Sequence, residues 1–183
     1  GRVSALLSLG TTIVVGGDFT EVVDPSGHTF PAAHLAKYDT ETGAFDTTWR
    51  PSADGSVLAL AASGDTLFVG GTFASLNGNL KAANFGAVSL STGASPAGFA
   101  GRVNREVDAL TVAGSSVYVG GLLTKVTDAS GARAVTYAAK LDVTTGAMDT
   151  RSQLSRPPIE RMLRIHEELR RGAFSNCSKL AGI

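Results

Sequence analysis

Three short stretches of the sequence decide the fold class: Ile13-Val14-Val15-Gly16-Gly17, Leu67-Phe68-Val69-Gly70-Gly71 and Val117-Tyr118-Val119-Gly120-Gly121. Each is a continuous apolar run that ends in two glycines. Such a run is typical of a strand that is buried on both faces and ends beside crowded backbone. The glycine pairs lie 54 and 50 residues apart. This regular spacing indicates an internal structural repeat.

Further anchors accompany each apolar run in the same order. An alternating segment precedes the run, as in Val57-Leu58-Ala59-Leu60, which predicts a strand. A Thr-Gly turn follows the run in every repeat, at Thr42, Thr92 and Thr145. Turn residues also occupy matching loops, at 24–27, 77–78 and 128–131. Each repeat is therefore expected to form four short strands, and the sequence predicts an all-β fold.

Four strands in about fifty residues are the signature of a β-propeller blade. The pattern Val-x-Ala-Leu, aliphatic-aromatic-Val-Gly-Gly-x-Phe, Leu-Asp or Tyr-Asp, and Thr-Gly resembles the bacterial β-propeller repeat of large secreted and cell-surface proteins, the delta-sixty class. The resemblance covers residues 3 to about 150 and implies a non-enzymatic propeller, often joined to adhesion-type modules. Leu122-Leu123 replaces a Phe-containing pair in the third repeat, which suggests a lost aromatic contact.

The expected architecture is a partial, three-blade β-propeller of four-stranded repeats at about 3–54, 55–104 and 105–152, with the first domain spanning 1–152. Three blades are fewer than the roughly 4 to 8 of a closed propeller. Two apolar end faces would therefore remain in water, and neither end repeat carries a polar cap. Three arrangements follow from this: a fragment of a larger propeller, self-pairing to six blades, or an open and poorly soluble chain.

The sequence pattern changes after Arg156, where Pro157-Pro158 interrupts the chain. Apolar residues then recur at three- and four-residue steps, which predicts a short C-terminal α-helix within a helical segment at 153–183. Residues 156–181 resemble the truncated start of a bacterial winged helix-turn-helix regulator, without the recognition helix that would read DNA. The resemblance implies an alternative function as a remnant of a transcription regulator. A frameshift or a gene fusion would explain the change of pattern equally well.

Composition limits the classes of protein that fit this chain. Its 183 residues are 43% hydrophobic and 17% charged, which provides a core and argues against a disordered chain. No run approaches the roughly 18 apolar residues of a membrane helix. Residues 1–150 carry 9 basic and 13 acidic side chains, whereas residues 151–183 carry 7 and 3. Such asymmetry is typical of segments with separate origins.

These features lead to expectations for partners and location. Because Cys177 is the only cysteine, no intrachain disulfide exists, which fits a reducing compartment or a secreted β-protein. We expect a secreted or cell-surface protein, or a cytoplasmic one if the C-terminal resemblance is meaningful. The expected partner is a protein or a glycan, with self-association through exposed blade faces as a further option. No membrane span is expected, nor is nucleic-acid binding.

No local motif indicates an enzyme, a metal site or a cofactor site. The histidines lack metal-ligand spacing, and the glycine pairs do not lead into a helix as a phosphate loop does. Trp49 and Arg50, between the first two repeats, are candidates for contact with a ligand or partner, although a Trp there also fits packing at a blade edge. A weaker candidate set for nucleic acid, which a solvated helix face would explain as well, comprises Arg161, Arg164, Arg170 and Arg171.

Overall fold

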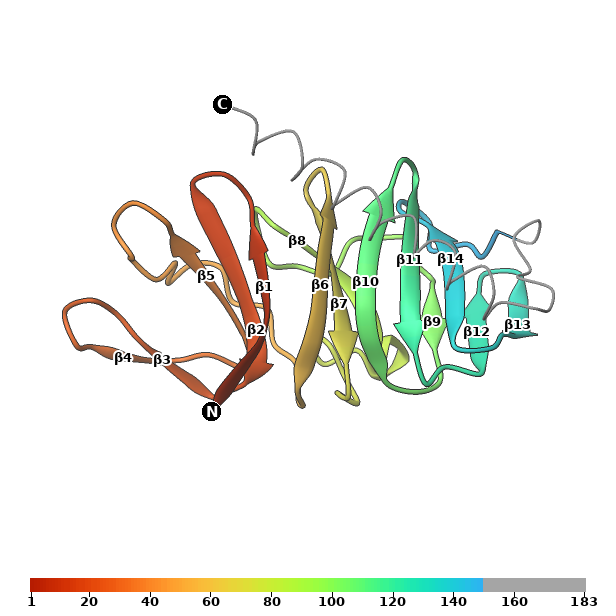
Figure 1. Cartoon of the computed structure of the whole chain (residues 1–183), viewed down its shortest axis with the longest axis horizontal. Coiled ribbons are helices and arrows are strands. Elements are labelled where there is room, and N and C mark those ends of the chain that lie inside the picture. The colour runs from red at the N-terminus through yellow and green to blue at the C-terminus, as the bar shows by residue number, and fades with distance from the viewer. Residues whose placement is uncertain (150–183) are drawn as a thin grey trace, which may run out of the picture. The chain divides into compact units, whose positions relative to one another are not determined.

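The computed structural model describes residues 1–149, which consist almost entirely of β-strands and turns, so the all-β prediction is confirmed. Each repeat forms one open, three-stranded antiparallel sheet, and the sheets lie side by side (Figure 1). The first sheet contains β1 (Arg2–Ser8), β2 (Thr12–Asp18) and β5 (Leu35–Asp39). The second contains β6 (Val57–Ser63), β7 (Thr66–Gly71) and β8 (Phe85–Ser89). The third contains β10 (Val107–Ala113), β11 (Ser116–Gly121) and β14 (Ala138–Asp142).

A tight turn joins the first two strands of every sheet. Its first residue is a glycine with positive φ, at 75° in Gly10, 55° in Gly64 and 58° in Gly114. Glycine adopts this conformation without the steric cost of a Cβ atom. The turn therefore brings the second strand back beside the first as its antiparallel neighbour.

The prediction of four strands per repeat is wrong, because each sheet has three strands. The fourth strand is reduced to a single bridge, from Tyr38 to Phe45 in the first repeat and from Leu141 to Met148 in the third. The next residue extends this contact in both repeats, since Asp46 N donates to Lys37 O at 2.8 Å and Asp149 N donates to Lys140 O at 3.1 Å. The second repeat has Pro96 at this position, and a proline has no N–H to donate.

The connection between the second and third strands is more ordered than the predicted loop. In the first repeat it is a hairpin of β3 (Glu21–Val23) and β4 (Thr29–Pro31). In the third repeat it is a hairpin of β12 (Lys125–Asp128) and β13 (Gly131–Ala134), and β9 (Arg102–Val103) pairs with β12. In the second repeat it is a turn at Asn77-Gly78 followed by the 3-10 helix η1 (Leu80–Ala82).

The second glycine of each pair lies beside a β-bulge. The register of the first two strands shifts between Val3 and Ala5, and at the matching positions of the other repeats. A side chain on this glycine would collide with the carbonyl oxygen of the partner strand, in the pairs Gly17 with Arg2, Gly71 with Ser56 and Gly121 with Glu106. The prediction that these glycines mark crowded backbone is confirmed.

The first glycine of each pair faces the next repeat in two of the three cases. A methyl group on Gly16 would lie 2.5 Å from Cγ1 of Val57, in the first strand of the second repeat. A methyl group on Gly70 would lie at the same distance from Cγ1 of Val107, in the first strand of the third repeat. Successive sheets therefore pack with one valine seated on one glycine, and β6 contacts both β1 and β10 (Figure 1).

Two hydrophobic clusters fill the spaces between successive sheets. Leu67 and Val69 belong to the cluster shared with the first repeat, whereas Phe68 belongs to the cluster shared with the third. The middle strand is thus buried on both faces, which explains its uninterrupted apolar sequence. Leu123, which replaces a phenylalanine of the other repeats, is fully buried in the second cluster. The third repeat therefore keeps a packed apolar side chain there, although it lacks the ring.

Several predictions concern residues 150–183, which lie outside the described residues. They are the C-terminal helix, the helix-turn-helix start and the four candidate arginines, Arg161, Arg164, Arg170 and Arg171. Across residues 1–149, no helix is long and apolar enough to cross a membrane.

Candidate functional site: a cleft repeated at a fifty-residue interval

A shallow cleft of about 290 Å³ lies where the first repeat leads into the second. One wall comes from the end of the hairpin and the start of β5, and the other comes from the segment that connects the two repeats. The walls therefore come from chain segments on either side of β5. The lining is largely apolar: Thr20, Pro31, Ala32, Ala33, His34, Leu35, Phe45, Trp49, Arg50, Pro51 and Ser52.

Trp49, a predicted contact residue, lines this cleft, but only 1% of its surface is exposed. Its indole Nε1 donates to the carbonyl oxygen of Ser89 at 2.9 Å, and the Lys37 ammonium lies 5.4 Å from the ring centroid. The ring belongs to the hydrophobic cluster between the first two sheets. Trp49 therefore has the packing position that the sequence analysis named as the alternative to ligand contact.

Arg50, the other predicted contact residue, is exposed at the rim of the same cleft. Its Nε donates to Thr47 O at 2.9 Å, and one terminal nitrogen donates to Pro31 O at 3.0 Å. The guanidinium also lies 5.6 Å from the ring centroid of Phe45. Within the described residues these contacts are with carbonyl oxygens and a ring, so they hold the cation in place without neutralising it, and its charge remains available to a ligand.

An ion pair joins the connecting segment to β5. Lys37 Nζ and Asp46 Oδ2 are 2.9 Å apart, and Lys37 also donates to Leu90 O in the second repeat. Burial by itself would raise the pKa of Asp46, but hydrogen bonds from Thr48, Lys37 and Trp49 outweigh it and hold this pKa well below its usual range. The carboxylate therefore stays charged and orders the segment that carries Trp49 and Arg50.

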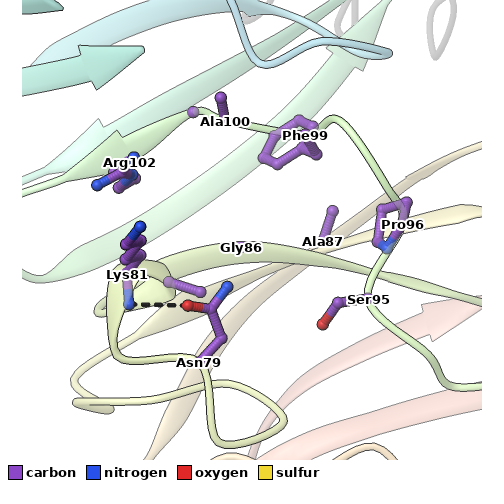
Figure 2. Close-up of a pocket in the computed structure, with 11 residues that line it drawn as sticks. Asn79, Lys81, Gly86, Ala87, Ser95, Pro96, Phe99, Ala100 and Arg102 are labelled. Carbon is purple, nitrogen blue, oxygen red and sulfur yellow. Dashed lines mark hydrogen bonds between the residues drawn. The ribbon is translucent and has the colours of Figure 1, made fainter. Parts of the chain in front are cut away.

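A second cleft, of about 150 Å³, lies where the second repeat leads into the third (Figure 2). It occupies the same place in the repeat as the first cleft, because many lining positions recur fifty residues later. Phe99 stands where the first cleft has Trp49, Lys81 where it has Pro31, and Arg102 where it has Ser52. The full lining is Asn79, Lys81, Ala82, Gly86, Ala87, Ser95, Pro96, Phe99, Ala100, Gly101 and Arg102.

The second cleft is more strongly cationic than the first. In the view of Figure 2, Lys81 and Arg102 lie on one side and Phe99 with Pro96 on the other. The side chain of Asn79 accepts a hydrogen bond from Lys81 N at 3.0 Å, which caps the 3-10 helix that carries Lys81. Within the described residues, no acidic side chain lines either cleft. An anionic group of a ligand could therefore approach the two cations without repulsion from the lining.

The acidic turn residues have structural partners. Asp24 accepts hydrogen bonds from Ser26 N and His28 N at 2.9 and 2.8 Å. Asp128 pairs with Arg133 at 2.9 Å and accepts from Met148 N at 2.8 Å. In the part of the chain that the structure describes, no group of three or more His, Cys, Asp or Glu side chains could hold a metal ion.

Comparisons with known proteins give no family assignment. No family model matches the sequence, and no curated protein matches it. The computationally designed Ika8 protein is similar in structure at 14% identity and a TM-score of 0.49, over 81% of this chain and 35% of that chain. The designed Ika4 protein is similar at 14% identity and a TM-score of 0.50, over 81% and 70%. This chain thus spans about a third of the Ika8 chain, and likeness at this identity concerns the fold alone.

The two residues predicted as contacts, Trp49 and Arg50, both line the first cleft, and no residue of the second cleft was predicted. Its two cations, Lys81 in η1 and Arg102 in β9, have no sequence motif around them. The fifty-residue offset between the first two repeats could have located this second cleft, because it aligns Phe99 with Trp49.

Proposed function

We propose that residues 1–149 are three blades of a partial β-propeller that acts as a non-enzymatic binding module of a secreted or cell-surface protein. The repeat period and the packing of successive sheets, with Val57 on Gly16 and Val107 on Gly70, support the blade assignment. One observation carries the functional proposal: a cleft recurs at the same place in two successive repeats. A repeated surface feature of this kind suits a ligand that is itself repetitive.

The chemistry of the clefts favours an acidic glycan among the expected protein and glycan partners. Each cleft combines an aromatic or proline wall with at least one cation and has no acidic lining residue. Cations that converge on a concave apolar surface favour a ligand with carboxylate or sulfate groups. Sugar rings offer apolar faces to such walls. A polymer could occupy both clefts at once, which raises its overall affinity beyond that of one cleft.

Binding of immobilised polysaccharides to the full chain tests this proposal. The probes are a sulfated polysaccharide, a carboxylated polysaccharide and a neutral dextran. We expect binding to an acidic polymer, and about tenfold or greater weakening in the double variant Lys81→Ala/Arg102→Ala, because charge-assisted hydrogen bonds contribute about 1.5–3 kcal/mol each. The matched control is Arg105→Ala/Lys125→Ala, which removes the same charge from exposed positions outside both clefts.

Two results would contradict the proposal. Absence of binding to both acidic polymers would refute the acidic-glycan ligand. Equal weakening in the two double variants would show that overall charge, rather than the cleft, attracts the polymer. The regulator alternative depends on residues 156–181, outside the described residues, and no observation in residues 1–149 favours it.

A further inference from the structure

The outer face of the first sheet presents the same side chains that the other sheets bury against their predecessors. Val3 is equivalent to Val57 and Val107 in the repeat. Val57 and Val107 are fully buried, whereas Val3 is 50% exposed. Leu6, which is equivalent to Leu60 and Leu110 in the repeat, is 64% exposed. In the second and third sheets, the equivalent valine and leucine pack against the preceding sheet. We call this pair the projection; in the first sheet it consists of Val3 and Leu6 and has no sheet of residues 1–149 packed against it.

The outer face of the third sheet presents the matching recess, which is the first glycine of the pair, where the valine of a following repeat would pack. Gly120 is equivalent to Gly16 and Gly70, but a methyl group there would meet nothing closer than Cβ of Ala109 at 3.7 Å. Tyr118 is equivalent to Phe68, which is fully buried between two sheets, yet Tyr118 is 42% exposed. The third sheet therefore offers a glycine that no valine of the described residues covers, beside a partly exposed aromatic ring.

The contacts at the two internal interfaces show how such surfaces fit. A methyl group on Gly16 would lie 2.5 Å from Val57 Cγ1 and 3.4 Å from Leu60 Cδ1. At Gly70 the corresponding distances to Val107 and Leu110 are 2.5 and 3.3 Å. The two interfaces agree within 0.1 Å, so the valine and leucine projection and the glycine recess form one interface that the chain makes twice.

We propose that a second copy of this chain docks head to tail, with Val3 and Leu6 of one copy seated on the Gly120 surface of the other. The docked pair would continue the interface that already joins the repeats, which is why a copy of the chain, rather than an unrelated partner, fits this surface. The contact is heterologous, because it joins two different surfaces of the chain. A pair joined by one such contact leaves one projection and one recess free, whereas a pair joined by two contacts closes into a ring. Two copies supply six repeats, within the roughly 4 to 8 that a propeller closes with.

The mass of the full chain, measured by sedimentation equilibrium over a wide range of concentration, tests the proposal. We expect reversible association that saturates at the mass of two chains. Leu6→Glu should abolish it by placing a charge in the interface, and the exposure of Leu6 makes this change tolerable for the single chain. Gly120→Val should abolish it by filling the recess, where the single chain has room. Urea unfolding of each variant checks that both remain folded.

A mixture of the two variants separates head-to-tail docking from other modes. Leu6→Glu keeps the recess and Gly120→Val keeps the projection, so the mixture should form a pair through the one intact combination while each variant alone stays single. Association of either variant alone would overturn the proposal, as would a single-chain mass for the unmodified protein at every concentration. A mass that grows without limit would support docking and overturn ring closure. Lys81→Ala/Arg102→Ala should leave the mass unchanged, which keeps this test independent of the proposed glycan function.

Discussion

Replacement of Gly70 by alanine tests the packing that joins the repeats. The new methyl group would lie 2.5 Å from Val107 Cγ1, 3.0 Å from Val107 Cβ and 3.3 Å from Leu110 Cδ1. Carbon atoms in contact normally lie about 3.5–4.0 Å apart. Val107 is fully buried, and its β-branched side chain has little rotamer freedom, so it cannot turn away. The sheets must therefore separate slightly.

The size of the effect follows from two opposing terms. Overpacking of a filled core typically costs about 1–3 kcal/mol. Replacement of glycine by alanine also restricts the unfolded chain, which stabilises the folded state by about 0.4–1 kcal/mol. We therefore expect Gly70→Ala to lower the free energy of unfolding by about 1–2 kcal/mol. With a urea dependence of about 2 kcal/mol per molar, the midpoint should fall by about 0.5–1 M.

The matched control is Gly120→Ala, at the equivalent position of the third repeat. The methyl group there meets only ordinary contact at 3.7 Å, so only the unfolded-state term should act and stability should stay the same or rise slightly. Urea unfolding followed by circular dichroism, at a concentration where the chain is single, measures both variants. Equal midpoints for Gly70→Ala and Gly120→Ala would refute the packing argument.

Three further changes have defined outcomes. Tyr137 has a φ of 61° and is 61% exposed. Asparagine tolerates this left-handed conformation better, so Tyr137→Asn, which copies Asn84 of the second repeat, should raise the free energy of unfolding by up to about 1 kcal/mol. A fall in the free energy of unfolding would contradict the argument that Tyr137 is strained. Asp54 accepts hydrogen bonds from two backbone N–H groups, as Asn104 does in the third repeat, so thermal unfolding should show Asp54→Ala destabilised and Asp54→Asn nearly unchanged. The pKa of Asp46 is lowered in the folded state, so its contribution is fully present above its ordinary pKa of 3.8 and is lost as the pH falls below it. The stability advantage over Asp46→Asn should therefore shrink on acidification, and a constant difference in urea titrations at several pH values would argue against this role.

Local chemistry explains why much of the fold could be predicted from the sequence. The Thr-Gly turn at Gly93 and the crowded backbone beside Gly71 each depend on a few neighbouring residues, and glycine is the residue that such conformations require. The reduced fourth strand escaped prediction because it depends on single hydrogen bonds, such as the one that Pro96 cannot donate.

The candidate site was harder to predict, because its walls come from segments that meet only after folding. The sequence singled out Trp49 and Arg50 together as contact candidates, but only Arg50 is exposed, because the indole of Trp49 is buried and donates a hydrogen bond to Ser89 of the next repeat. Lys81 and Arg102 lie about twenty residues apart and have no local pattern to connect them. Concave shape and converging charge are properties of tertiary packing rather than of short sequence patterns.

By itself, the sequence determined the three repeats, their all-β character and the positions where backbone must pass without a side chain. Tertiary structure alone decided which of these glycines meets a neighbour: Gly16 and Gly70 are covered by a valine, and Gly120 is not. The physical reason is that a bulge forms within one sheet from adjacent residues, whereas the burial of a sheet face depends on whether another sheet lies against it.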